Sequence, residues 1–539
     1  MNIPRPLVVA PVQYANAALL VTCVLIASLA ALWLKQDASW DLLNYHFYDP
    51  WAWLGGRTFD WDIAAAQLQT FHNPLADVPF YLLVAANADP RVITLWLALP
   101  TGVAAYFFVK IAWQLLADLR PAERVSATVA AAAIGFTGAM GVGQLGSTTD
   151  EWLITSFTMA SLWLLLREST AASARSSNSV LMLAGLLMGI ASGLKLTAAT
   201  YAVGLCATLL VRRFSFSLNM RAATLYSMGI AGGLVISLGP WCYTLWAHFR
   251  NPLFPYANQW FRSPWWELQS VLSDRFGPHT VSEWVLLPFK LLAPPRGFVS
   301  EVSYVDARLP LLYGLAIIAA GGQLFARTQG ATLPLPASFH MTSRGWRLTS
   351  TAFVVSFSVW AALHSILRYT IPLEILSGIL VVGLLGYLLR TRDATAAVTL
   401  AVVGLIATTI WSDWGRVDFG PAWFDVRVPH IEPNALVLLT ADAPMSYVLP
   451  FFPPDARYVG IRNNINDPSR HNRLAEKIAA VVREHRGPLY ALSFPAGAGE
   501  ADLRAHRLRR VAGGCADVRT NMPTSPIQLC RLERIGAIP

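Results

Sequence analysis

The sequence contains few charged residues. Only 14% of its 539 residues are Asp, Glu, Lys or Arg, while 55% are hydrophobic. A soluble globular chain carries about 25% charged residues, so this composition excludes an ordinary soluble domain and predicts a polytopic membrane protein. The formal net charge of +9 does not predict nucleic acid as a partner, because most of the surplus arginine lies in short loops, where it sets membrane orientation.

Cysteine is also scarce, and five cysteines in the whole chain are too few for a disulfide framework. Cys23, Cys206 and Cys242 lie in or beside apolar runs and are expected to be packing residues. Cys515 and Cys530 lie outside those runs, and the alternatives for them are a disulfide or two free thiols. We predict the disulfide, because the topology below places both in an oxidising compartment.

Two common sequence signals are missing. The N-terminus has no cleavable-signal pattern, because its first apolar run, about 13–34, is too long for a signal peptide. No Walker A motif or dinucleotide fingerprint occurs between a strand and a helix. The first run is therefore a retained span, and a nucleotide sugar is not the expected direct substrate.

Apolar runs long enough to cross a bilayer recur through residues 1–411. About eleven spans are predicted, and up to thirteen if half-spans are counted separately. Every short loop on the predicted cytoplasmic side contains arginine, as the positive-inside rule expects. The N-terminus is thus predicted inside, with outer loops at about 35–91 and 248–308. The predicted spans are about 13–34, 92–117, 125–142, 152–166, two short spans within 179–211 that meet near Lys195, 222–247, 309–326, 348–367, 371–389 and 395–411.

The hydropathy falls after the last span, so residues 412–539 are predicted to form a separate domain. Segments 434–440, 488–493 and 527–532 are apolar and short, which is typical of buried strands, and 474–485 has helical spacing. This alternation predicts a small α/β domain. The topology places it on the periplasmic side.

A polar stretch follows the first span, and it holds the strongest candidates for chemistry. A carboxylate, histidines and aromatics emerge together at a membrane surface, where an enzyme that acts on a lipid-borne substrate would need them. The alternative is a solvated loop with interfacial aromatics. Asp41 is the candidate catalytic base, in competition with Asp49, Asp60, Asp62 and Asp77. The candidate substrate-binding residues here are Asn44, Tyr45, His46 and His72.

No set of metal ligands is recognised. His46 and His72 could join Asp41 around a divalent cation, but no ligand spacing supports this. The sequence therefore identifies no definite cofactor, and a divalent cation is the alternative.

Three further polar groups are predicted on the same face of the membrane. Asp150 and Glu151 open a span, where they either cap a helix or position a substrate. Lys195 either binds a phosphate or extends to the interface. Arg368, followed by Tyr369, either binds a phosphate or pairs with an acid such as Glu374.

The order of these groups resembles that in a known family. The residues concerned are Asp41, Pro74-Leu75, Arg91, Asp150, the segment Gly189–Lys195, Pro240-Trp241, Asn251-Pro252 and Arg368-Tyr369 with Pro372. The chain resembles the GT-C-fold glycosyltransferases, in particular the branch of protein O-mannosyltransferases and lipid A aminoarabinose transferases. Two features depart from that branch: the first loop has Trp40-Asp41 where the family pairs Asp with Glu, and the C-terminal domain matches none of its patterns.

The resemblance implies a glycosyltransferase of the bacterial inner membrane. Its donor would be a sugar linked to polyprenyl phosphate, and its acceptor a glycan, a lipid or a protein. The alternative is a transporter, flippase or polymerase of a lipid-linked glycan. A transporter favours internal repeats and polar residues at mid-membrane, whereas here the polar groups gather at one face.

Overall fold

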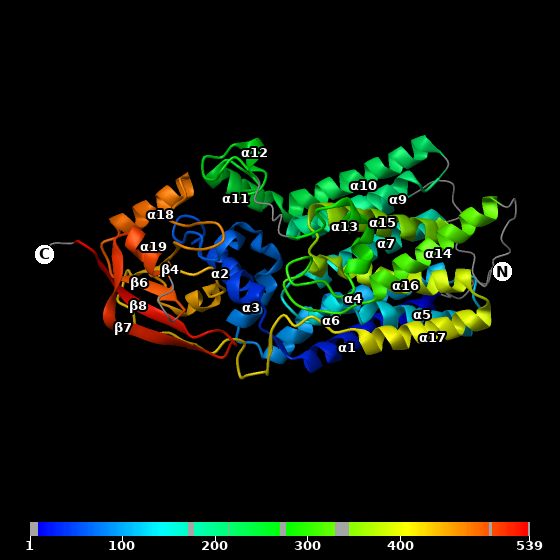
Figure 1. Cartoon of the computed structure of the whole chain (residues 1–539), viewed down its shortest axis with the longest axis horizontal. Helices are drawn as coiled ribbons and strands as arrows, with labels where there is room; N and C mark the ends of the chain where they lie inside the picture. Colours follow the sequence, from blue (N-terminus) through cyan, green and yellow to red (C-terminus); the bar gives the residue numbers. More distant parts are fainter. Residues whose placement is uncertain are drawn as a thin grey trace, which may run out of the picture.

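The computed structural model describes residues 9–170, 177–213, 215–269, 276–328, 344–494 and 499–536. The chain forms a long bundle of helices with a smaller sheet domain packed against one end (Figure 1). Residues 1–8, the predicted cytoplasmic N-terminus, lie outside the described residues.

The helices of the bundle lie close to the predicted apolar runs. Among the helices described, five are long and apolar enough to cross a membrane, and the bent pair α10–α11 would make six. The chain is a multi-pass membrane protein, and the figure of about eleven spans stays a prediction. The bundle helices are α1 (Val9–Leu34), α4 (Pro90–Leu115), α5 (Pro121–Phe136), α6 (Ala139–Gly143), α7 (Glu151–Thr170), α8 (Asn178–Leu194), α9 (Ala199–Leu210), α10 (Phe216–Ser237), α11 (Gly239–Phe249), α14 (Arg308–Thr328), α15 (Arg344–Leu363), α16 (Ile371–Leu388) and α17 (Thr391–Thr408).

Two helices replace the single span predicted over 222–247. α10 and α11 are bent by 60° where they meet. Pro240 lies in the first turn of α11, and proline has no amide hydrogen with which to continue a helical ladder. The bend directs α11 toward the sheet domain (Figure 1).

Small residues bring α8 and α10 into close contact. Gly185, Gly189 and Gly193 recur at every fourth position of α8, and a Cβ at Gly189 would lie 2.2 Å from the carbonyl oxygen of Ile230. Such backbone packing drives helix association in lipid, where the hydrophobic effect between helices is absent. It fixes the end of α8, which Lys195 follows directly.

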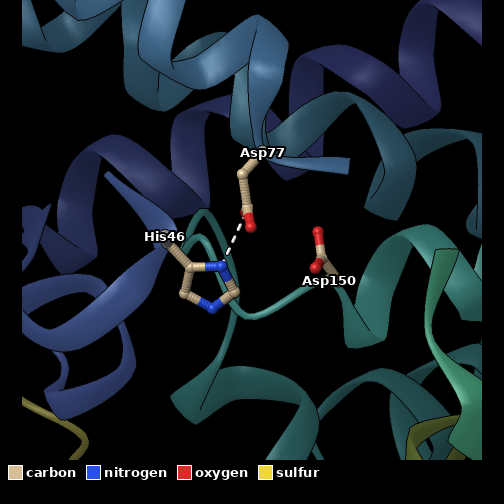
Figure 2. Close-up of side chains that lie close together, drawn as sticks. All are labelled: His46, Asp77 and Asp150. Atoms are coloured by element: carbon tan, nitrogen blue, oxygen red, sulfur yellow. Dashed lines mark hydrogen bonds and ion pairs between the residues drawn. The ribbon is translucent and has the colours of Figure 1, made fainter. Parts of the chain in front are cut away.

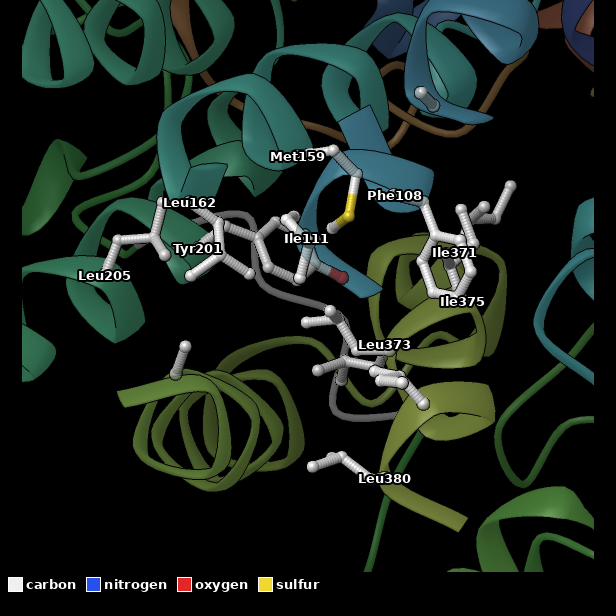
Figure 3. Packing of buried hydrophobic residues seen from close by; sticks show 14 of the residues in the cluster. Phe108, Ile111, Met159, Leu162, Tyr201, Leu205, Ile371, Leu373, Ile375 and Leu380 are labelled. Atoms are coloured by element: carbon white, nitrogen blue, oxygen red, sulfur yellow. The ribbon is translucent and has the colours of Figure 1, made fainter. Parts of the chain in front are cut away.

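The bundle core is apolar and continuous through α4, α7, α9 and α16. Close packing of this kind makes an interior rigid, so it holds the ends of α7 and α16 in place. Figure 3 shows the side chains of Phe108, Ile111, Met159, Leu162, Tyr201, Leu205, Ile371, Leu373, Ile375 and Leu380 within this core.

The polar stretch after α1 folds into short helices. They are the π-helical turn η1 (Leu42–His46), α2 (Tyr48–Leu54), the 3-10 turns η2 (Gln67–Phe71) and η3 (Pro74–Ala76), and α3 (Val78–Ala85). All residues of η1 are buried, and π-helical turns are frequent at functional sites. Asn73 fastens the stretch to the bundle, because its Nδ2 donates to the carbonyls of Gly193 at 2.9 Å and Ser237 at 2.8 Å.

The loop at 248–308 contains the short helices α12 (Asn258–Phe261) and α13 (Val281–Lys290). α13 begins with a capping box. The side chain of Thr280 accepts the backbone amide of Glu283, and the side chain of Glu283 accepts the backbone amide of Thr280.

Beyond α17 the chain forms a six-stranded mixed sheet in the order β3-β7-β8-β6-β4-β5. The strands are β3 (Val426–Arg427), β4 (Leu436–Leu439), β5 (Arg457–Gly460), β6 (Leu489–Ser493), β7 (Leu508–Thr520) and β8 (Ile527–Arg534). β4 pairs in parallel with β5 and β6, whereas β8 is antiparallel to β6 and β7. The helices of this domain are η6 (Ser446–Phe451), α18 (Arg473–Glu484) and α19 (Glu500–Ala505).

The predicted disulfide is present. Cys515 of β7 and Cys530 of β8 are bonded and are direct partners across the two strands. Cys515 follows two glycines, Gly513 and Gly514, which lie within β7 where its pairing with β8 is irregular, between Arg510 and Cys515.

The sheet domain holds the loop that carries Asp41. A short ladder pairs β1 (Gln36–Asp37) with β2 (Arg416–Val417), and Ile63 bridges to Val459 of β5. Arg57 of the loop donates to Asp62 at 2.8 Å and to the carbonyl of Pro454 at 2.8 Å. The loop is therefore packed between the bundle and the sheet.

Candidate functional site

Four segments that are far apart in the sequence meet at the end of the bundle nearest the sheet domain. Asp41 follows α1, and Asp150 comes directly before α7. Lys195 lies between α8 and η4 (Leu196–Ala198), and Arg368 lies in η5 (Leu367–Thr370), just before α16. The sequence predicts that these groups share one face, and the structure brings them together.

Asp41 and Arg368 form a buried ion pair. The Nη1 of Arg368 donates to Oδ2 of Asp41 at 2.7 Å, and the two side chains are 16% and 6% exposed respectively. The guanidinium also lies 5.4 Å from the ring centroid of Tyr369. Glu374 is not the partner, because its carboxylate accepts the backbone amides of Met140 and Gly141.

Lys195 is held in a similar way. Its Nζ lies 2.5 Å from Oε1 of Glu151 and 2.6 Å from the carbonyl oxygen of Thr149. The ammonium is 5.7 Å from the ring centroid of Tyr369. Lys195 therefore does not extend freely to the interface, and the two cations flank a single tyrosine ring.

A histidine and two carboxylates form a cluster (Figure 2). The charge of Lys195 acts on Asp150, a member of this cluster. The Nδ1 of His46 lies 2.6 Å from Oδ1 of Asp77, and one ligand atom from each of His46, Asp77 and Asp150 lies within 4.8 Å of the others. Asp150 has a positive φ of 63°, a conformation that costs energy for a residue with a Cβ. The structure thus groups His46 with Asp77 and Asp150, whereas the sequence suggested Asp41 and His72.

The residues of this cluster change one another's pKa values. Burial raises the pKa of Asp150 to about 7, and the nearby charge of Asp77 adds to the rise. Burial lowers the pKa of His46, but the charge and hydrogen bond of Asp77 outweigh that effect and raise it to about 9. Like charges crowded in a buried place oppose ionisation, so a proton or a cation is favoured here.

The charged neighbours of Asp41 set the pKa of its carboxyl. Burial alone would raise the pKa of this carboxyl. The positive charge of Arg368, with smaller contributions from His46 and Lys195, outweighs burial and holds the pKa below its usual range. Asp41 is therefore ionised while Arg368 remains its partner.

The remaining predicted residues line the same region. His72 shares a hydrogen bond of 2.9 Å with the hydroxyl of Tyr256, and burial followed by the charge of Lys195 lowers its pKa to about 4. The ring of Tyr45 lies between His46, with centroids 4.1 Å apart, and His72, with centroids 5.9 Å apart. The amide of Asn44 donates to Gln69 at 3.2 Å, so it holds the loop together.

Two of the competing aspartates, Asp60 and Asp62, are engaged elsewhere. Asp60 is 74% exposed and contacts His248 and Lys477. Asp62 is paired with Arg57. Asp49 is buried, and burial together with the charge of Asp77 raises its pKa well above the usual value.

Sequence reasoning missed two side chains. Gln144 joins two segments of the site, because its Nε2 donates to the carbonyl of Arg368 at 3.3 Å and its Oε1 accepts from Thr149 at 2.9 Å. Tyr256, the partner of His72, follows the segment that begins at Asn251. Gln144 could have been identified from the sequence, because it is a polar residue at the end of an apolar run.

No protein-family model and no curated protein matches the sequence. The fold is that of the GT-C glycosyltransferases, as the resemblance predicts. It is shown by the crystal structure of ArnT from Cupriavidus metallidurans bound to undecaprenyl phosphate, which is similar over 96% of this chain and 97% of that one, with 12% identity and a TM-score of 0.51. The apo structure of the same protein covers 96% and 98%, with 13% identity and a TM-score of 0.48. The oligosaccharyltransferase of Archaeoglobus fulgidus in its apo form covers 88% and 69%, with 10% identity and a TM-score of 0.44.

Proposed function

We propose that the protein is a membrane glycosyltransferase that moves a sugar from a polyprenyl-phosphate donor to a glycan, lipid or protein acceptor. Its place would be the inner membrane of a bacterium, with the site and the sheet domain on the periplasmic side. The protein that shows the fold, ArnT, is described with undecaprenyl phosphate bound, which supports a lipid phosphate as the ligand of this site.

The pair of cations around Tyr369 carries the proposal. The side chains of Lys195 and Arg368 are each 16% exposed, while their partners Glu151 and Asp41 are 2% and 6% exposed. The positive groups are thus more exposed than the acids that hold them. Arginine binds phosphate through a planar fork and lysine through a point charge, so this arrangement suits the phosphate of the donor.

Donor binding would also prepare the base. A phosphate that engages Arg368 competes with Asp41 for the guanidinium. Asp41 then loses its principal positive neighbour, and burial raises its pKa toward the range in which a carboxylate accepts a proton efficiently.

The transfer itself would be inverting. The acceptor oxygen attacks the anomeric carbon of the sugar while its proton passes to Asp41. The bond from that carbon to the phosphate oxygen breaks, and polyprenyl phosphate leaves with the electron pair. Lys195 and Arg368 stabilise the negative charge that develops on the leaving phosphate.

A divalent cation belongs to the proposal as a cofactor. One nitrogen and two carboxylate groups from His46, Asp77 and Asp150 approach within 4.8 Å, and this mixture of donors suits a divalent transition metal. A cation held there would neutralise the crowded carboxylates and supply positive charge to the leaving phosphate.

The transporter alternative is less well supported by the geometry. A transporter places its substrate site near the bilayer midplane, whereas Asp41, Asp150, Lys195 and Arg368 all lie at helix ends.

Binding of undecaprenyl phosphate, the expected product lipid, tests the proposal. Native mass spectrometry of the purified full chain should show binding that weakens about tenfold in Arg368→Gln and in Lys195→Gln, since each loses one charged contact. Lys35→Gln is the matched control, because Lys35 forms an exposed ion pair with Asp418 near the same end. Equal binding by all four proteins would refute the phosphate site.

A further inference from the structure

A positively charged cavity lies at the end of the bundle opposite the Asp41 site. It has a volume of about 460 Å³ and opens between α1, α4, α5 and α7. α4 begins at Pro90 and contacts β1, which precedes Asp41, and Lys110 lies 20 residues further along the helix, about 30 Å away at 1.5 Å per residue. The cavity is therefore a membrane thickness away from the Asp41 site and cannot be part of it.

The walls of the cavity are positively charged. Lys110, Arg124 and Arg167 line it, and no carboxylate is among its described lining residues. The Nζ of Lys110 donates to the neutral Oδ1 of Asn16 at 2.9 Å. The Nε of Arg124 donates to the carbonyl of Trp113 at 2.8 Å. Because these partners carry no charge, they orient Lys110 and Arg124 without neutralising them.

Aromatic rings surround the same cations. The guanidinium of Arg124 lies 4.0 Å from the ring centroid of Trp113, and that of Arg167 lies 5.5 Å from the ring centroid of Trp163. Trp113 is 40% exposed. Tryptophan is enriched where a membrane protein meets the lipid headgroups, so the cavity lies at headgroup depth.

We infer that this cavity binds the phosphate-bearing headgroup of an anionic glycerophospholipid. Basic pockets between membrane helices are suited to such headgroups, and a volume of this size is in the range of ligand pockets. The phosphate would be shared by Lys110 and Arg124, while the acyl chains lie along the exposed face of Trp113. A bound lipid would tie together α1, α4 and α5 at the end remote from the catalytic site.

Native mass spectrometry of the full chain in detergent can test this with four probes: phosphatidylglycerol, phosphatidylcholine of the same acyl chains, undecaprenyl phosphate and inorganic phosphate. We expect phosphatidylglycerol to bind more tightly than phosphatidylcholine, and inorganic phosphate not to displace it. Lys110→Gln should weaken phosphatidylglycerol binding about fivefold, in line with the contribution of one cation near anionic lipid. Lys110→Arg should retain it.

Arg221→Gln is the matched control, because Arg221 also donates to a neutral asparagine, Asn178, at 3.1 Å and lies outside the cavity. Its phosphatidylglycerol binding should equal that of the wild type. Equal binding of phosphatidylglycerol and phosphatidylcholine, or loss of binding in Arg221→Gln to the same degree as in Lys110→Gln, would overturn the inference. Preference for undecaprenyl phosphate, weakened by Lys110→Gln, would overturn the glycerophospholipid assignment.

If Lys110→Gln does not accumulate in membranes, the salt dependence of the wild type decides. Exposed charge contacts are screened as salt rises, because the Debye length shortens. The preference for phosphatidylglycerol should therefore fall between about 50 mM and about 500 mM salt. A preference that does not change with salt would contradict a charged pocket. None of these outcomes depends on the proposed transferase activity.

Discussion

Replacing Asp41 with asparagine should separate catalysis from donor binding. The substitution keeps the shape of the side chain and removes the negative charge that lies 2.7 Å from Arg368. The proposed base is then lost, and we expect the rate of sugar transfer to fall about a hundredfold or more. The same change leaves the guanidinium of Arg368 without its acidic partner.

The affinity for the lipid phosphate should therefore rise. Two unit charges about 4 Å apart attract by roughly 4 kcal/mol at an effective dielectric constant of 20. Solvent reaches Arg368, and the phosphate replaces only part of what Asp41 supplied, so we expect a net gain of about 1.4 kcal/mol, which is tenfold in affinity. A slower enzyme that binds undecaprenyl phosphate more tightly is an outcome that misfolding cannot produce.

The assay needs two measurements on each purified protein: single-turnover transfer from isolated polyprenyl-phosphate-linked sugars, and binding of undecaprenyl phosphate. Asp60→Asn is the matched control, because Asp60 lies in the same loop but is exposed and contacts His248 and Lys477. Near-wild-type turnover by Asp41→Asn would refute Asp41 as the base. Weaker lipid binding by this variant would show that Asp41 does not compete with the phosphate.

Further predictions concern the metal, the disulfide and the sheet domain. Chelation with EDTA should reduce transfer, and Mn²⁺ or Zn²⁺ should restore it in the wild type but not in Asp150→Asn, whereas transfer unaffected by EDTA would exclude the cation. The double variant Cys515→Ser and Cys530→Ser should lose about 3 kcal/mol of domain stability, since the bond closes a loop of about 15 residues; an unchanged melting temperature of the full chain would contradict this. Arg57→Met should destabilise the contact of the sheet domain by about 3–5 kcal/mol by leaving Asp62 buried without its cation, and limited proteolysis should then cut the chain near 412–434, whereas Arg427→Met, at an exposed ion pair, should not change the pattern.

Hydropathy located most helices because each apolar run is long and bounded by polar residues or proline. It could not find the break in α10–α11, since Gly239 and Pro240 lie inside a continuous apolar run. In the sheet domain β4, β6 and β8 were predictable from buried apolar residues. β7 was not, because most of its residues are partly or fully exposed and carry no alternation.

The sequence predicts which residues belong to the site better than it predicts which of them contact each other. Each of the four residues lies just before or just after a predicted span, and this predicts that all of them share one face of the membrane. They are Asp41, Asp150, Lys195 and Arg368. Asp41 and Arg368 are 327 residues apart in the chain, however, and they meet only because the segment after α1 and the turn η5 before α16 come together in the fold. The grouping of His46 with Asp77 arises from the fold of the first loop, which no local pattern encodes.

A cryo-electron microscopy structure of the full chain with undecaprenyl phosphate tests the central claim most directly. We predict density for the phosphate in contact with Lys195 and Arg368 beside Tyr369, with Asp41 released from the guanidinium. Density for the phosphate at another place, with the contact between Arg368 and Asp41 intact, would contradict the proposed donor site.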